Sequence, residues 1–117
     1  MVYAASSLAL AILEYYVHLP PQMRLRSALP ELVAIALDVP NDAIETLSVP
    51  DLANLTLQDT RDIGDDWIRS RRSLGLLVPS RAVPYDLNLL VNPAHPRLGQ
   101  ALIAIQTPFL FDDRLAI

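Results

Sequence analysis

The chain has 117 residues, of which 52% are hydrophobic, so it suits one small folded domain rather than a disordered segment. Its net charge of -4 argues against a nucleic-acid surface or an anionic-membrane surface, because both need clustered positive charge. The absence of cysteine excludes disulfides, thiolate nucleophiles and cysteine zinc sites, and it fits a cytoplasmic protein.

The first 20 residues predict a short strand followed by a helix. Residues 2–5 read as the strand, and Ser6 or Ser7 is a suitable N-cap for a helix that runs to about His18. Pro20 and the proline after it end this helix, because proline cannot continue the hydrogen-bond ladder. No apolar run reaches the ~18 residues needed to span a bilayer, so we expect a soluble protein.

Glu14 is the only formally charged side chain between residues 1 and 23. On a helix, its neighbours three and four positions away are apolar or imidazole side chains: Leu10, Ala11, Val17 and His18. Such a carboxylate must either find a partner from elsewhere in the fold or stay partly protonated. Two interpretations stay open, a carboxylate at the exposed edge of a buried helix and a functional carboxylate that lines a cleft.

The middle of the chain predicts two paired strands and a second helix. Residues 31–39 read as a buried strand between prolines, and residues 43–47 as a second strand that pairs with it across a Pro-Asn-Asp turn. Residues 48–59 read as a loop. Residues 60–73 read as a helix whose acidic first half and basic last half complement the helix dipole. The arginines at its end, Arg69, Arg71 and Arg72, indicate either a solvated helix terminus or an anion site.

Four further short strands are predicted in the last third of the chain, over residues 76–79, 87–91, 101–105 and 108–111. A rigid turn is expected between the second and third of them, at Asn92 to Pro96. Short strands mixed with two helices, without regular βαβ alternation, predict an α+β fold.

Few residues remain as candidates for chemistry. The three glycines form no phosphate-binding loop, the chain has no lysine, and two distant histidines make a poor metal site, so we expect no metal. Ser80 follows a strand and can either hold a ligand or satisfy its own turn. Asn92 and His95 suit turn roles, and Tyr3 suits a place in the core.

The order of several short blocks nevertheless resembles a known family, the RES domain. The blocks span nearly the whole chain: Val-Tyr-Ala-Ala-Ser-Ser-Leu-Ala-Leu-Ala-Ile-Leu-Glu (2–14), Ile-Gly-Asp-Asp-Trp (63–67), Val-Pro-Ser (78–80), Asn88 with Asn-Pro-Ala-His-Pro (92–96) and Phe-Asp-Asp-Arg-Leu (111–115). The family is named for an Arg, a Glu and a Ser. Glu14 and Ser80 match the last two, and Tyr3 matches the family's tyrosine.

The resemblance implies small twisted sheets flanked by helices, as in ADP-ribosyltransferases, and an activity that degrades NAD. It implies Glu14 and Tyr3 as catalytic residues, and Ser80 and Asn92 as residues that bind NAD. It also implies the toxin half of a toxin–antitoxin system, with a helix-turn-helix antitoxin as partner and no direct contact with nucleic acid or membrane.

The chain departs from the family pattern at its start. None of its nine arginines precedes Glu14, so we expect a single RES-like domain over residues 1–117 that lacks the family's N-terminal block and its signature arginine. An exposed sheet edge would follow, and with it possible homo-oligomerisation. The alternative function is therefore a catalytically inactive, truncated RES relative that binds an antitoxin or associates with itself.

Overall fold

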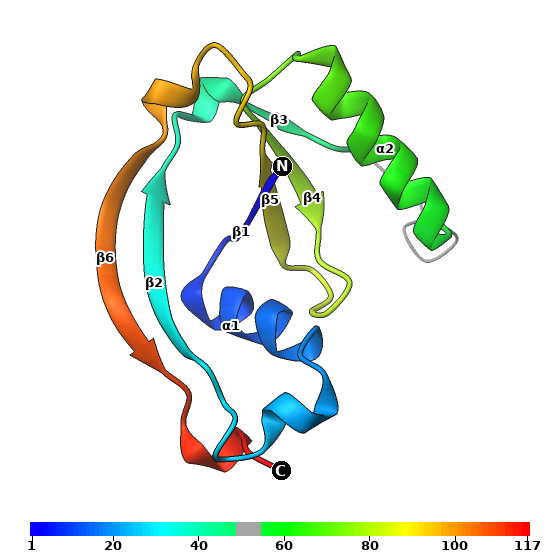
Figure 1. The fold of residues 1–117 in the computed structure, drawn as a ribbon. Helices are drawn as coiled ribbons and strands as arrows, with labels where there is room; N and C mark the ends of the chain where they lie inside the picture. Colours follow the sequence, from blue (N-terminus) through cyan, green and yellow to red (C-terminus); the bar gives the residue numbers. More distant parts are fainter. Residues whose placement is uncertain (49–54) are drawn as a thin grey trace.

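The computed structural model describes residues 1–48 and 55–117 (Figure 1). Its strands form two sheets, a four-stranded sheet with the order β1-β5-β4-β3 and a two-stranded ribbon of β2 and β6. The strands are β1 (Val2–Ala5), β2 (Glu31–Asp38), β3 (Ile44–Thr46), β4 (Gly75–Pro79), β5 (Leu87–Val91) and β6 (Leu102–Leu110). The chain therefore mixes helices and sheets, as the sequence predicted.

The first helix, α1 (Leu8–Val17), begins and ends as its sequence predicts. Ser7 is the N-cap, and its hydroxyl accepts a hydrogen bond of 3.1 Å from the backbone N–H of Leu10. At the other end, Nδ1 of His18 lies 2.6 Å from the carbonyl oxygen of Glu14, where it satisfies one of the last helical carbonyls. Helix α1 lies at the end of the four-stranded sheet where β1 and β4 end and β5 begins (Figure 1).

The predicted hairpin between β2 and β3 is wrong. A 3-10 turn at Asn41–Ala43 redirects the chain, and β3 then pairs in parallel with β4, with Ile44 opposite Gly75. Helix α2 (Leu57–Ser70) connects these two parallel strands, so the chain does contain one βαβ unit. A network of polar contacts strengthens this pairing, because Glu45 of β3 binds side chains of the segment that follows α2.

Helix α2 begins at Leu57 rather than at Thr60, because Thr56 and Asp59 form a reciprocal capping box. It ends at Ser70, and Arg71 then takes a left-handed conformation with φ of 53°. The predicted loop over residues 48–59 falls partly outside the described residues, since 49–54 are not described.

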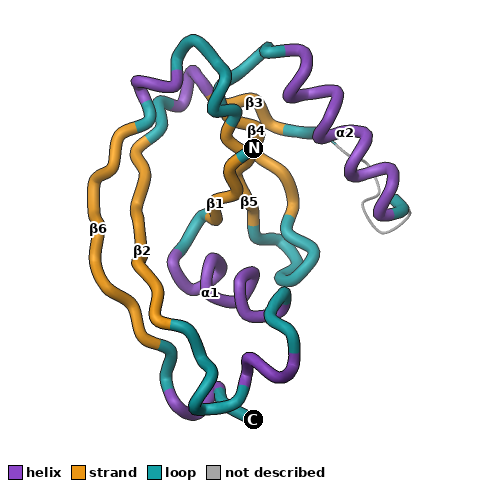
Figure 2. Tube along the Cα trace, viewed as in Figure 1, coloured by secondary structure: helices purple, strands orange, loops and turns teal. Residues whose placement is uncertain are grey.

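The two strands predicted near the C-terminus are a single strand, β6, which pairs antiparallel with β2 (Figure 2). Pro108 lies inside it, opposite Val33. A proline is tolerated there because β6 has a free edge, where a missing N–H donor breaks no ladder bond. The end of the ribbon contacts α1, since the ring of Phe111 lies 6.2 Å from that of Tyr15 and 6.1 Å from that of Tyr16.

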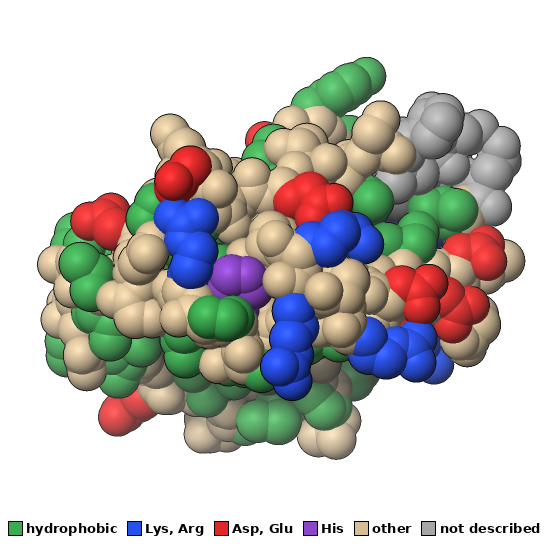
Figure 3. Space-filling model, turned by 90° about the horizontal axis from the view of Figure 1, so that it is seen from above, with side chains coloured by type: hydrophobic (Ala, Val, Ile, Leu, Met, Phe, Trp, Pro, Cys, Tyr) green, Lys and Arg blue, Asp and Glu red, His purple; other side chains and the backbone are tan. Residues whose placement is uncertain are grey.

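The core lies on the two faces of the four-stranded sheet. On one face, Trp67 of α2 packs against Leu76 of β4 and Leu90 of β5. On the other face, Leu74 and Val91 pack with Ala43. The exposed surface seen from above carries acidic and basic side chains close together (Figure 3), consistent with four ion pairs among the described residues.

Candidate active site

Glu14 reaches the four-stranded sheet because of its position on α1. Leu10 is the buried residue of this helix, with 3% of its surface exposed, and it anchors one face of α1 in the protein. Glu14 follows four residues later, so it extends from the same face one turn further along. Its side chain is partly buried. Glu14 is therefore neither fully exposed nor fully buried, and its contacts on the sheet side of the helix define its surroundings.

Ser80 is the first partner of the Glu14 carboxylate. It follows the last residue of β4 and is 4% exposed, and its hydroxyl donates a hydrogen bond of 2.7 Å to Oε1 of Glu14. The same oxygen of Ser80 accepts hydrogen bonds of 3.1 Å from the backbone N–H groups of Ala82 and Val83. The turn role considered for Ser80 is thus present, and its hydroxyl also holds the carboxylate of Glu14, while a role of Ser80 in holding a ligand stays a prediction.

Asn88 is the second partner. It lies on β5 directly opposite Val78 of β4, and its Nδ2 donates a hydrogen bond of 2.8 Å to Oε1 of Glu14. Directly opposite residues on paired strands share one face of a sheet. Asn88 therefore faces the same side as Val78, the side on which Trp67 packs. The helix and two adjacent strands meet at this carboxylate.

The two oxygens of Glu14 differ in their surroundings. Both donors meet Oε1, whereas Oε2 accepts no hydrogen bond from the residues that the structure describes. Glu14 also takes part in none of the four ion pairs found there. Two neutral donors thus fix this carboxyl group through one oxygen, and a carboxylate held in this way can stabilise positive charge on a bound molecule.

Tyr3 lies on the same face of the sheet as this site. It is opposite Leu90 across the β1–β5 pair, and the next residue on that face, Ala5, is opposite Asn88. Tyr3 and Asn88 are therefore diagonal neighbours, at a spacing of about 7–8 Å that aromatic side chains can bridge. Tyr3 is 74% exposed, so the expectation that it belongs to the core is wrong. Its ring is available to a ligand on this face.

Asn92 is not brought to Glu14. It follows β5 at the far end of the sheet, about 13 Å from Asn88 along the strand. It is 1% exposed, its Nδ2 donates to the carbonyl oxygen of Ile68 at 3.2 Å, and its Oδ1 accepts from the N–H of Ala94 at 3.0 Å. These contacts fix the turn after β5. Both polar atoms of the Asn92 side chain thus have partners within the fold, and these partners lie away from Glu14, Ser80 and Asn88.

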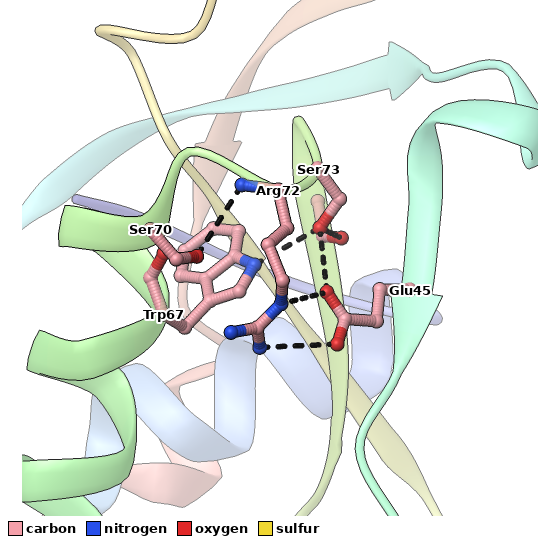
Figure 4. Close-up of polar contacts among 6 residues, drawn as sticks. Glu45, Trp67, Ser70, Arg72 and Ser73 are labelled. Carbon is pink, nitrogen blue, oxygen red and sulfur yellow. Dashed lines mark hydrogen bonds and ion pairs between the residues drawn. The ribbon is translucent and has the colours of Figure 1, made fainter.

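The arginines at the end of α2 lie beside acidic side chains. Arg69 pairs with Asp66 at 2.8 Å, and the guanidinium of Arg72 binds both carboxylate oxygens of Glu45 at 3.1 and 3.3 Å (Figure 4). Ser73 joins this network through Glu45 and through the indole N–H of Trp67. Two of the three arginines therefore have carboxylate partners, which fits a solvated helix end better than an anion site.

The described part of the chain offers neither a metal site nor a membrane-spanning helix. No three acidic or imidazole side chains lie grouped there in a way that could hold a metal ion. Neither of the α-helices within residues 1–48 and 55–117 has the length and apolar character needed to cross a bilayer.

Comparison with known proteins assigns the chain to a family. The model of the RES domain matches residues 1–112. The chain belongs to the RES domain family. Toxin Res of Yersinia enterocolitica is 38% identical over 120 residues, which cover 97% of this chain and 76% of that protein. The Prs ADP-ribosylating toxin of a Sphingobium species is 35% identical over 124 residues, or 98% of this chain and 74% of that protein. Toxin Res of Pseudomonas putida is 36% identical over 123 residues, or 98% and 79%.

The resemblance inferred from the short sequence blocks is thereby confirmed. Of the residues carried over from it, Glu14 and Ser80 are in direct contact and Tyr3 lies on the same sheet face. Sequence reasoning gave no role to Asn88, although it quoted that residue as part of a motif. The available signal was its polarity in an otherwise apolar strand, Leu-Asn-Leu-Leu-Val, beside a serine that ends the neighbouring strand.

Proposed function

We propose that this protein is a toxin that degrades NAD by breaking the bond between nicotinamide and ribose. Membership of the RES family supports this proposal, as do relatives that are named as toxins. A further relative is named as an ADP-ribosylating toxin, and NAD is the usual donor for that chemistry. The observation that carries the proposal in this chain is the Glu14 carboxylate, held through one oxygen by Ser80 and Asn88.

The reaction needs stabilisation of positive charge more than it needs an acid. When the glycosidic bond breaks, its electron pair moves to the pyridinium nitrogen, and nicotinamide leaves as a neutral molecule. The ribose gains oxocarbenium character in the transition state, and a nearby carboxylate lowers its energy. Oε2 of Glu14 would supply that charge. Water or phosphate would then form the new bond at the same ribose carbon.

The neighbours of Glu14 suit this role. No basic side chain among the described ion pairs neutralises it, so its charge is available to the ribose. Ser80 fixes the carboxylate, and its one hydroxyl proton and its oxygen are used by Glu14 and by the N–H groups of Ala82 and Val83. Tyr3, exposed one row away on the same face, would stack on a ring of NAD or orient the ribose. The proposal includes an ADP-ribosyltransferase-like fold and a cytoplasmic site of action, where NAD is consumed.

A helix-turn-helix antitoxin is the partner that the proposal implies, and it would act by covering the NAD site. One observation favours a second function, that of a binding or self-associating module. Most of β6 is exposed, including the aliphatic side chains of Leu102, Ile103, Ile105 and Leu110. An apolar surface of this kind is typical of a protein–protein contact. A module of that kind would bind its partner without consuming NAD.

The deciding experiment compares NAD loss by purified wild type and Glu14→Gln. We expect the variant to fold and to lose roughly 100-fold or more in turnover, the scale of removing one preorganised electrostatic group. Glu31→Gln is the matched control, because Glu31 lies exposed on β2 of the other sheet. Equal rates for wild type and Glu14→Gln would dispose of the catalytic role. Product analysis with and without phosphate identifies the acceptor.

A further inference from the structure

We infer that Asn88 is a positioning residue for Glu14. Together with Ser80 it fixes Oε1, so that Oε2 is the oxygen presented to the ribose. This inference rests on the proposed NAD chemistry and adds to it a residue and a distinction between the two carboxylate oxygens. It follows from three observations: the shared acceptor, the rigid elements that carry the donors, and an unpaired atom of Asn88.

The first two observations concern geometry. Oγ of Ser80 and Nδ2 of Asn88 lie 2.7 and 2.8 Å from the same oxygen. Asn88 lies on β5 and Ser80 directly follows the adjacent antiparallel strand β4, and the backbone N–H of Ser80 donates to the carbonyl of Asp86 at 2.8 Å, which closes the loop between those strands. A glutamate on a helix has three rotatable side-chain bonds. Two donors from a sheet restrict it to one orientation, which is the requirement for a preorganised catalytic group.

The third observation separates this role from a role in stability. Oδ1 of Asn88 is buried and has no hydrogen-bond partner among the described residues. A buried acceptor without a partner disfavours folding, and an apolar side chain of similar size would avoid that cost. Asn88 is therefore a poor choice for stability alone at this position. What it contributes is the Nδ2 donor, and its only acceptor among the described contacts is Glu14.

The direction of the Asn88 amide is also determined by Glu14. An ionised carboxylate accepts hydrogen bonds and cannot donate them, so it must face Nδ2 rather than Oδ1. Removing this donor leaves Oε1 held by Ser80 alone, and the carboxylate can then rotate away from its productive orientation. Because Asn88 acts through Glu14, its loss should lower kcat while leaving the KM for NAD nearly unchanged.

The test uses Asn88→Leu, which removes the donor and the unpaired acceptor together, and Asn88→Asp, which keeps the shape and replaces the donor by a like charge. We expect kcat for NAD loss to fall on the order of 10-fold in the first variant, the scale of one hydrogen bond to a charged group, and further in the second. Loss of the hydrogen bond to Glu14 lowers stability and removal of the unpaired Oδ1 raises it, so the thermal midpoint of Asn88→Leu should lie close to that of wild type. A purely structural asparagine would give a lower midpoint instead.

The double variant with Glu14→Gln provides the sharper readout. A residue that acts through Glu14 loses its effect when Glu14 is replaced, so Asn88→Leu should change the residual rate of Glu14→Gln by less than 2-fold. Leu89→Ala is the matched control, since Leu89 is the next residue on β5 and packs on the other face of the sheet. Leu89→Ala should change the rate of NAD loss by the same factor in the wild-type background and in the Glu14→Gln background.

A spectroscopic measurement tests the hydrogen bond itself, and measurements of NAD loss separate failure of this inference from failure of the proposed function. In the ¹H–¹⁵N spectrum, one side-chain amide proton of Asn88 should lie downfield and should move in Glu14→Ala, and an unchanged signal would contradict the hydrogen bond. If wild type consumes no NAD, the proposed function is wrong and the positioning role for that reaction falls with it. If wild type is active but Asn88→Leu keeps full kcat, or raises KM alone, the inference is overturned while the proposed function stands.

Discussion

Replacing Ser80 by Ala should destabilise the fold as well as the site. The hydroxyl of Ser80 donates to Glu14 and accepts from the backbone N–H groups of Ala82 and Val83. A hydrogen bond to a charged group contributes about 1.5–3 kcal/mol, and we take the lower end because Glu14 is only partly buried. Losing one acceptor for two loop N–H groups adds about 1–2 kcal/mol. We therefore expect Ser80→Ala to lower the free energy of unfolding by about 3 kcal/mol.

Urea unfolding followed by circular dichroism measures this change, and the thermal midpoint should fall by roughly 10 °C for a domain of this size. Glu14→Ala is the comparison, because it removes the carboxylate but leaves the turn bonds of Ser80 intact. It should cost less than Ser80→Ala, and the double variant should show coupling between the two residues. A thermal midpoint for Ser80→Ala within about 2 °C of that of wild type would refute the reasoning, because on the same scaling it means almost no loss of stability.

Two predictions concern groups outside the site. The side chain and backbone N–H of Arg114 hydrogen-bond to Asp112 and lower the pKa of its carboxyl from 3.8 to about 2. The folded pKa lies below the unfolded one, so the contribution of this pair to stability is present above pH 3.8 and lost as pH falls through about 2. An NMR titration of Asp112 should show that midpoint, and Arg114→Ala should return it toward the usual range. Tyr85 is fully exposed and has φ of 71°, a left-handed conformation that is unfavourable for its side chain. Tyr85→Gly should therefore be about 1 kcal/mol more stable toward urea than Tyr85→Ala, and equal stabilities would contradict the strain.

Local chemistry allowed most elements to be predicted, because the residues that start and stop them are close in sequence. Ser7 caps α1, and the proline pair at 20–21 follows its end. The start of α2 was misplaced by three residues because its capping box uses Asp59 in place of the more usual Glu or Gln. Cap chemistry thus gives boundaries reliably only where the common residue types are used.

Strand pairing was the part that local reasoning could not supply. Residues 43–47 looked like the return strand of a hairpin, but β3 pairs with β4, which lies about thirty residues further along the chain. The choice depends on the turn at Asn41–Ala43, whose sequence predicts a turn but not its direction, and on the contact between Glu45 and Arg72, which has no sequence signature. For β6, Pro108 suggested a break between two strands, whereas a free edge tolerates it.

The residues of the candidate site show how much of such a site can be predicted from a single sequence. The isolation of Glu14 was visible as one charge in an apolar stretch, and that pattern already indicated either partners from outside the helix or partial protonation. The structure supplies neutral donors as those partners rather than a basic side chain. Ser80 and Asn88 are neutral donors, yet they lie 66 and 74 residues from Glu14 along the chain.

The meeting of Ser80 and Asn88 at Glu14 depends on the register of β4 with β5, in which Asn88 lies opposite Val78. A shift of one residue would turn Asn88 to the other face and leave the carboxylate with Ser80 alone. The register of this strand pair therefore decides whether Glu14 is held by both donors, as the proposed catalytic role requires, or by Ser80 alone.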